Sequence, residues 1–122
     1  MPNFERYDIV SVPFPYVERA ALARRPALVV SSPSLEDRLS LLWVLMITAA
    51  ENRGWQDDIE IADHLSAGLP IPSIIRPTKI ATVEARRAEF VGHIPPALAD
   101  AVAVALRSII ADQHDQREPA LR

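Results

Sequence analysis

The sequence predicts a mainly β domain, built as a small, twisted and mostly antiparallel barrel, with one helix at its C-terminal end. Short apolar segments recur along the first 94 residues, and proline or polar residues separate them. About five to seven strands of this length and spacing are typical of a small barrel. The segment after residues 95–96 repeats its apolar residues with the 3.6-residue period of a helix.

Three strands are expected in the first half of the chain: one over residues 7–13, one within the stretch 24–32 and one over residues 41–48. In the second of them, Pro26 belongs at the first strand position, because proline cannot donate to the hydrogen-bond ladder. The third is the most apolar segment of the chain, and its length favours a buried strand over a helix. We therefore expect Trp43 in the core and a surface connection over residues 33–40.

Four further strand segments are expected, over residues 57–62, 72–75, 79–83 and 88–94. The first alternates polar and apolar residues like a short edge strand, and its acidic side would keep that edge from pairing with other chains. Pro77 is expected to interrupt pairing and to leave Arg76 exposed. The apolar stripe of the C-terminal helix consists of Leu98, Val102, Ala105, Leu106, Ile109 and Ile110.

Length and composition indicate one intracellular domain over residues 1–112, followed by a charged and disordered tail over residues 113–122. The absence of cysteine excludes disulfides and thiolate metal sites. No apolar run reaches membrane-spanning length, and no signal peptide is visible at the start, so we expect a cytoplasmic protein that does not bind membranes. A net charge of −3 argues against bulk attraction to nucleic acid, although a local basic cleft remains possible.

Three polar residues are candidates for chemistry. The three glycines form no phosphate-binding loop, and the three histidines lack ligand spacing, so neither a cofactor nor a metal is expected. Arg25 stands at the start of one strand, Thr48 ends another, and Arg76 precedes a proline. A guanidinium fork suits phosphate. The alternative interpretation is that these arginines are solvated and that Thr48 only caps its strand.

Four stretches together resemble the MazF/PemK family of toxins from bacterial toxin–antitoxin systems: YDIVSVPFP at residues 7–15, RRPALVVS at 24–31, MITA at 46–49 and SIIRPTKIATVE at 73–84. The resemblance implies an SH3-like barrel of the MazF/PemK (CcdB-like) type, closed by a C-terminal helix and working as a homodimer. It implies a metal-independent endoribonuclease that cuts single-stranded RNA at short sequences, leaving a 2′,3′-cyclic phosphate and a 5′-hydroxyl. It also implies an antitoxin partner that occupies the RNA groove.

By this match, Arg25 supplies charge and hydrogen bonds at the scissile phosphate, Thr48 supplies a hydroxyl, and Arg76 is a further catalytic contact. Some members carry an aspartate that acts as the base two residues after this arginine. This chain has Thr78 at that position, and its hydroxyl cannot take a proton at neutral pH. Glu51 and Glu18 are substitutes by nearness in sequence only, and either is equally well a solvated carboxylate.

The residues expected to contact RNA are Glu18, Arg19, Arg24, Trp55, Thr78 and Lys79. Trp55 either stacks on a base, as is usual for single strands, or belongs to the core. Residues 17–23 lead directly into Arg24 and form a possible lid over the ligand.

Three rival functions remain open at this stage. A non-nuclease member of the same fold would poison DNA gyrase by protein contact and would leave RNA intact. A degraded toxin would bind its antitoxin and cut nothing, which Thr78 and the acidic balance allow. A plain SH3-like interaction module would tolerate the loss of Arg25.

Overall fold

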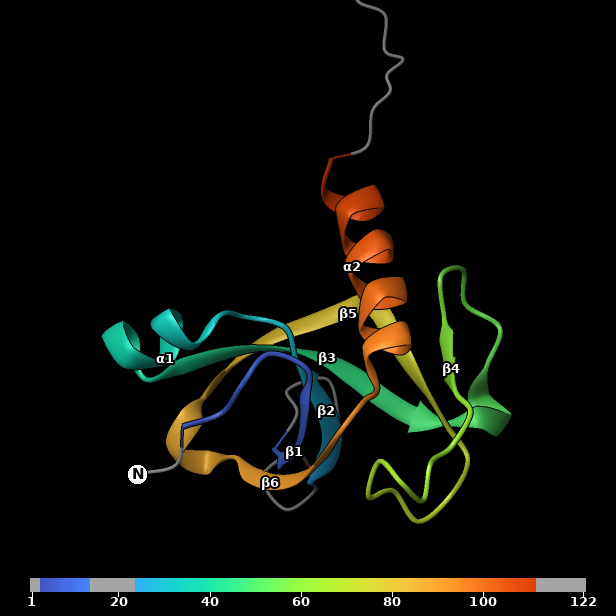
Figure 1. The fold of residues 1–122 in the computed structure, drawn as a ribbon, viewed down its shortest axis with the longest axis horizontal. Coiled ribbons are helices and arrows are strands. Elements are labelled where there is room, and N and C mark those ends of the chain that lie inside the picture. The colour runs from blue at the N-terminus through green and yellow to red at the C-terminus, as the bar shows by residue number, and fades with distance from the viewer. Residues whose placement is uncertain (1–2, 14–23, 112–122) are drawn as a thin grey trace, which may run out of the picture.

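The computed structural model describes residues 3–13 and 24–111, and it confirms a mainly β fold with a C-terminal helix. Within these residues, six strands form one curled sheet in the order β4-β5-β3-β2-β1-β6 (Figure 1). All neighbouring strands are antiparallel. The strands are β1 (Asp8–Val12), β2 (Arg25–Val29), β3 (Leu41–Ala49), β4 (Ile59–Ile61), β5 (Ser73–Glu84) and β6 (Glu89–His93). The helices are α1 (Pro33–Leu39) and α2 (Pro96–Ile110), with 3-10 turns η1 (Ala50–Asn52) and η2 (Ala85–Arg87).

The middle parts of the central strands β2 and β3 are buried on both faces of the sheet. Ala27 and Val44 belong to one hydrophobic cluster, whereas Leu28 and Leu45 belong to another, which also contains Val102 of α2. All five side chains are fully buried. Burial on both faces explains why these segments are continuous apolar runs and not alternating ones.

Helix α2 packs on the sheet with the N-terminal part of its predicted stripe. Val102 is fully buried, and Leu98 and Leu106 pack around the same cluster. Ile109 and Ile110 are 41% and 76% exposed, because the end of the helix extends beyond the sheet (Figure 1). No helix in the described part of the chain is long and apolar enough to cross a membrane.

The expected surface connection at residues 33–40 is mostly the helix α1. Pro33 suits its first turn, where no backbone N–H is needed. Ser40 ends the helix in the left-handed region at φ 59°, and its N–H donates to the Glu36 carbonyl at 2.8 Å. The buried Glu36 side chain accepts a hydrogen bond from the Phe4 backbone N–H at 2.8 Å. The helix therefore holds the N-terminal segment in place through a hydrogen bond between residues that are 32 positions apart in the sequence.

Strand β5 is continuous, whereas the sequence predicted two pieces broken at Pro77. On β3, Leu45 pairs with Ile80 and the next residue, Met46, pairs with Arg76. The intervening residues 77–79 therefore form a bulge. A bulge tolerates proline, because the missing N–H removes no bond from the ladder.

Trp43 is 49% exposed, so the expected core position was wrong. Its neighbours Leu42 and Val44 are buried on the opposite face of β3. An apolar strand still alternates between two faces, and the face that Trp43 occupies is open to solvent at this position. The predicted edge strand at residues 57–62 is confirmed in place but is shorter, since β4 covers three residues.

The loop of residues 62–72 leaves β4, at one edge of the sheet, and packs against β6, at the other edge. A Cβ atom at Gly68 would lie 2.5 Å from the Val91 carbonyl oxygen, and one at Gly92 would lie 2.1 Å from the Ala67 carbonyl oxygen. Both glycines therefore permit two backbones to touch. The loop joins the two edges and closes the curled sheet.

We expect Gly92→Ala to destabilise the protein by about 1–3 kcal/mol, because the added methyl group overpacks the contact with residue 67. Urea denaturation measures this change. His93→Ala, at the exposed neighbour on the same strand, is the matched control and should cost less than about 0.5 kcal/mol. Equal stability of the two variants would contradict the close contact between the loop and β6.

Candidate functional site

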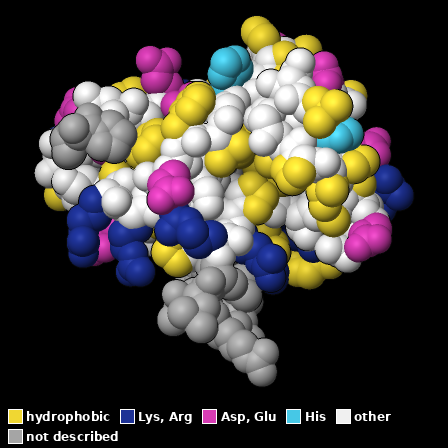
Figure 2. Space-filling model, turned by 90° about the horizontal axis from the view of Figure 1, so that it is seen from below, with side chains coloured by type: hydrophobic (Ala, Val, Ile, Leu, Met, Phe, Trp, Pro, Cys, Tyr) yellow, Lys and Arg dark blue, Asp and Glu magenta, His cyan; other side chains and the backbone are white. Residues whose placement is uncertain are grey.

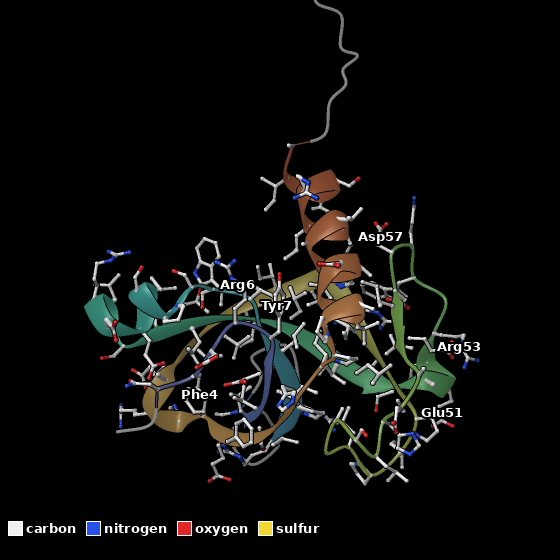
Figure 3. All side chains as sticks on the ribbon, viewed as in Figure 1. Phe4, Arg6, Tyr7, Glu51, Arg53 and Asp57 are labelled. Carbon is white, nitrogen blue, oxygen red and sulfur yellow. The ribbon has the colours of Figure 1, made fainter. Side chains whose placement is uncertain are left out.

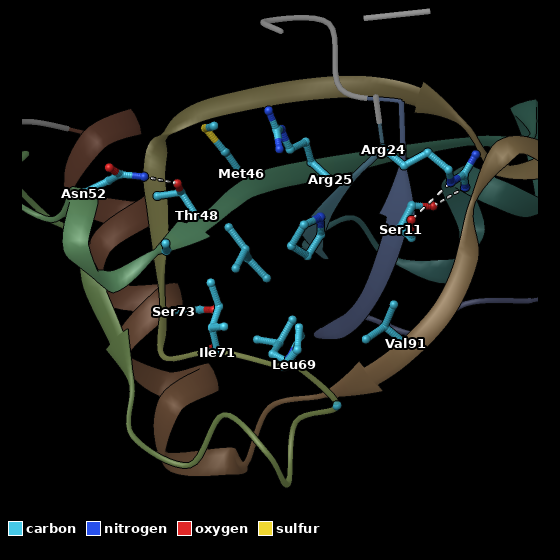
Figure 4. A pocket seen from close by; sticks show the side chains of 15 residues that line it. Ser11, Arg24, Arg25, Met46, Thr48, Asn52, Leu69, Ile71, Ser73 and Val91 are labelled. Atoms are coloured by element: carbon cyan, nitrogen blue, oxygen red, sulfur yellow. Dashed lines mark hydrogen bonds between the residues drawn. The ribbon is translucent and has the colours of Figure 1, made fainter. Parts of the chain in front are cut away.

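A pocket of about 660 Å³ opens where β2 begins, β3 ends and β5 begins (Figure 4). The loop of residues 62–72 and β6 complete its wall through Leu69, Ile71 and Val91, which are apolar. The polar side chains of the lining are Ser11, Arg24, Arg25, Thr48, Asn52 and Ser73. Residues from five separate stretches of the chain therefore meet at one end of the sheet.

Arg25 and Thr48 lie on neighbouring strands and line the same pocket. Ala27 pairs with Met46, and continuing this antiparallel register by two residues places Arg25 beside Thr48 on the same face. Figure 4 shows both side chains along one rim of the pocket. The guanidinium of Arg25 is exposed and has no hydrogen bond or ion pair with any residue that the structure describes. Among the described residues, none competes with an anionic ligand for this guanidinium.

Arg24 also lines the pocket, but its guanidinium bonds to the protein itself. Nε donates to the Ser11 hydroxyl at 3.1 Å, and Nη2 donates to the carbonyl oxygens of Ser11 and Arg87. These bonds join the start of β2 to β1 and η2, and Figure 4 shows those to Ser11. The two adjacent arginines thus differ, since one supports the framework and the other faces the pocket.

Asn52 is a pocket residue that the sequence analysis did not select. Its Nδ2 donates a hydrogen bond to Thr48 Oγ1 at 2.9 Å (Figure 4). The turn η1 reverses the chain after β3 and returns Asn52 to the strand end. The signal in the sequence is a polar residue four positions after Thr48, directly beyond the apolar strand.

Arg76 is buried, and the expectation of an exposed side chain was wrong. It is 5% exposed and does not line the pocket. Its Nε and Nη2 bond to the two carboxylate oxygens of Asp58 at 3.0 and 2.9 Å, and Nη2 also donates to the Asn52 carbonyl at 2.9 Å. Asp58 was expected to protect the sheet edge, but it is the counter-ion of Arg76.

The Trp55 ring contacts two cations, Arg76 and Lys79. The Trp55 ring centroid lies 4.2 Å from Arg76 Cζ and 5.3 Å from Lys79 Nζ. Trp55 remains 49% exposed, and Thr78 is exposed in the bulge of β5. None of these residues lines the pocket. Their RNA contacts stay predictions.

The described lining of the pocket contains no carboxylate and no histidine. Glu51 is exposed at the periphery of the fold with Arg53, away from this lining (Figure 3). Glu18 and Arg19, with the expected lid at residues 17–23, lie outside the described residues, as does the tail at residues 113–122. Among residues 3–13 and 24–111, no group of three or more His, Asp and Glu side chains is arranged to hold a metal ion.

The charge of the surface is uneven despite the net charge of −3. Figure 2 shows Lys and Arg side chains gathered along one side of a face and hydrophobic side chains over the other. The pocket combines the same two features, since Arg25 lies opposite an apolar wall. Such a pocket suits a ligand that carries both an anionic group and an apolar or aromatic one.

Residues 5–110 match the family of PemK-like, MazF-like toxins of type II toxin–antitoxin systems. The chain is similar in fold to a chain of the MazE–MazF complex from Deinococcus radiodurans, with a TM-score of 0.73 and 19% identity over 91% of this chain and 98% of that chain. It is also similar to a mycobacterial endoribonuclease in complex with its cognate antitoxin, with a TM-score of 0.71 and 14% identity over 92% and 99%. No curated protein matches the sequence.

Asp58 is held in its charged form. Burial acts to raise the pKa of Asp58, but hydrogen bonds from Arg76 and from the Trp55 and Gly54 backbone N–H groups, with the Arg76 charge, lower it below its ordinary value of 3.8. A carboxyl group whose pKa is lower in the folded state stabilises the fold above its unfolded pKa. This stabilisation is lost as the pH falls through the folded pKa.

We expect Asp58→Asn to lower the free energy of unfolding by about 3 kcal/mol at pH 7, because it leaves the buried Arg76 without a counter-charge. The difference from wild type should shrink at an acidic pH below the lowered pKa of Asp58, where the wild-type carboxyl group is protonated as well. Urea denaturation at both pH values measures it.

The matched control is Glu60→Gln, which removes the ion pair between Arg53 and Glu60, whose side chains are 60% and 64% exposed. It should cost less than about 1 kcal/mol at pH 7. An equal loss of unfolding free energy in the two variants would contradict the larger stabilisation expected from the buried pair of Arg76 and Asp58.

Proposed function

The chain belongs to the PemK-like, MazF-like toxins of type II toxin–antitoxin systems, and on this premise we propose that it is an endoribonuclease that cuts single-stranded RNA. The observation that carries the proposal is the pocket shared by Arg25 and Thr48, in which Arg25 has no partner among the described residues. A guanidinium beside a hydroxyl is a suitable site for a phosphodiester.

In the proposed reaction, the 2′-hydroxyl of one nucleotide attacks the adjacent phosphorus and the bond to the 5′-oxygen breaks. The products are a 2′,3′-cyclic phosphate and a 5′-hydroxyl. Arg25 remains protonated in water, so it stabilises the negative charge of the pentacoordinate phosphate. Thr48 donates a hydrogen bond to the same group. Donors that are already oriented toward developing charge contribute strongly to catalysis.

The apolar wall formed by Leu69, Ile71 and Val91 supports the proposal, because unpaired bases are gripped by apolar and aromatic surfaces. We propose that the RNA strand continues past Met46 toward the half-exposed Trp55, and that Thr78 and Lys79 contact the RNA backbone. No cofactor takes part in this reaction. We also propose that the protein works as a homodimer, as the family implies.

An antitoxin is the second proposed ligand of the pocket. Solved structures with this fold include a MazE–MazF complex and an endoribonuclease bound to its cognate antitoxin. We propose that a segment of this chain's own antitoxin, with an acidic group for Arg25 and apolar side chains for the loop wall, occupies the pocket and excludes RNA.

A toxin that binds its antitoxin without cutting RNA is the alternative candidate. One observation favours it: the described lining of the pocket offers no carboxylate or imidazole to accept the proton of the attacking hydroxyl. Such a protein would retain the partner surface and lack the reaction.

We expect the purified protein to cut a long mixed-sequence RNA at discrete sites in the presence of a chelator. Sequencing of the fragment ends should show cyclic phosphate and 5′-hydroxyl termini, because the proposed attack uses no metal and no water. Intact RNA after incubation would contradict the nuclease proposal and support the alternative candidate.

We expect Arg25→Ala to lower kcat for RNA cleavage by about 10²–10³-fold, as removal of one oriented donor commonly does. The midpoint of thermal unfolding should stay near the wild-type value, since the side chain is exposed and has no described partner. Arg86→Ala is the matched control, because that side chain is 77% exposed in η2 and should leave kcat unchanged. Normal cleavage by Arg25→Ala would remove the catalytic assignment.

A further inference from the structure

The buried guanidinium of Arg76 is bonded to the protein itself through Nε and Nη2. Nε bonds to Asp58 Oδ1, Nη2 bonds to both Asp58 Oδ2 and the Asn52 carbonyl, and one face contacts the Trp55 ring. The side chains of the ion pair are 7% and 9% exposed. A guanidinium held in this way anchors the groups to which it is bonded.

Asp58 extends this anchor over the turn before β4. Its Oδ2 accepts hydrogen bonds from the backbone N–H groups of Gly54 and Trp55 at 3.2 and 3.1 Å. The carboxylate of Asp58 therefore bonds back to the start of the turn of residues 54–58 and joins this turn to Arg76 on β5. Arg76 also holds Asn52, two residues before this turn, by donating a hydrogen bond to its backbone carbonyl oxygen.

Asn52 connects the anchor with the pocket. Its backbone carbonyl accepts from Arg76, whereas its side-chain Nδ2 donates to Thr48 Oγ1. An amide nitrogen can only donate, so the Thr48 oxygen must be the acceptor in this bond. The hydrogen of the Thr48 hydroxyl is then left for a different acceptor, and Thr48 lines the pocket in which a ligand would lie (Figure 4).

We propose that Asn52 is a positioning residue, which orients the Thr48 hydroxyl so that it donates into the pocket, and that Arg76 and Asp58 hold Asn52 in place. The inference rests on the proposed nuclease function, because it assigns a direction to a hydroxyl of that site. It replaces a direct catalytic role of Arg76 with an indirect one. The chain of contacts runs from Asp58 through Arg76 and Asn52 to Thr48.

A double-mutant cycle between Asn52 and Thr48 tests the proposal. Asn52→Ala should lower kcat for RNA cleavage by about 10- to 100-fold and change KM by less than about twofold, because a misplaced donor weakens the transition state more than binding. Asn52→Asp should be worse, since its carboxylate accepts the hydroxyl hydrogen. In a Thr48→Val background, Asn52→Ala should cause no further loss.

Arg76→Lys separates positioning from charge. Lysine keeps the positive charge but cannot bond to both Asp58 oxygens and the Asn52 carbonyl in the same fork, so kcat should fall as in Asn52→Ala. Full activity of Arg76→Lys would overturn the proposed anchor. Arg53→Gln is the matched control, because Arg53 follows Asn52 directly and is exposed, and its kcat should equal the wild-type value.

NMR of the ¹⁵N-labelled protein gives a readout that does not depend on activity. The side-chain amide resonances of Asn52 should shift in Thr48→Val, which removes the acceptor, and should stay unchanged in Arg53→Gln. Unchanged resonances in Thr48→Val, or an equal loss of kcat from Asn52→Ala with and without the Thr48 hydroxyl, would overturn the proposal. If the wild-type protein cuts no RNA, the nuclease function fails, and the NMR result alone decides whether Asn52 holds Thr48.

Discussion

The antiparallel pairing of β2 with β3 is the constraint on which the site depends. Ala27 and Leu28 are buried on opposite faces of β2, and their partners on β3 are Met46 and Leu45. A slip of one residue would exchange the two faces of a strand, so the packing of both hydrophobic clusters determines the register. The same register brings the first residue of β2 beside Thr48. The core therefore sets the geometry of a site that contains few core residues.

The wall opposite that pair comes from the loop of residues 62–72. This loop connects two edges of the sheet that the strand ladder leaves apart, and it does so through backbone contacts at Gly68 and Gly92. Larger residues in place of Gly68 and Gly92 would separate the loop from β6. The register of β2 and β3 thus produces the cationic rim of the pocket. The close contact at Gly68 and Gly92 produces its apolar wall.

Arg76 illustrates how burial changes the role of a residue. Pro77 predicted a break in pairing and an exposed arginine, but the bulge of β5 absorbs the proline and leaves Arg76 inside the fold. There it requires a counter-charge, which Asp58 supplies from a turn 18 residues earlier. Asp58 then bonds to the backbone of Gly54 and Trp55, and Arg76 bonds to the Asn52 carbonyl. In the sequence Arg76 resembles a catalytic group, whereas in the structure its guanidinium is buried and bonded to Asp58 and Asn52.

The sequence by itself determined the local features: the strands β1, β2, β3 and β6, the start of α2 at the double proline, and the family to which the chain belongs. These follow from period, proline position and short motifs, which depend on neighbours within a few residues. Only the tertiary structure decided the exposure of Trp43, the burial of Arg76, its pairing with Asp58, the bond from Asn52 to Thr48 and the closure by the loop. Each of these depends on contacts between segments distant in sequence or on which face of a strand is covered, and no local pattern encodes either.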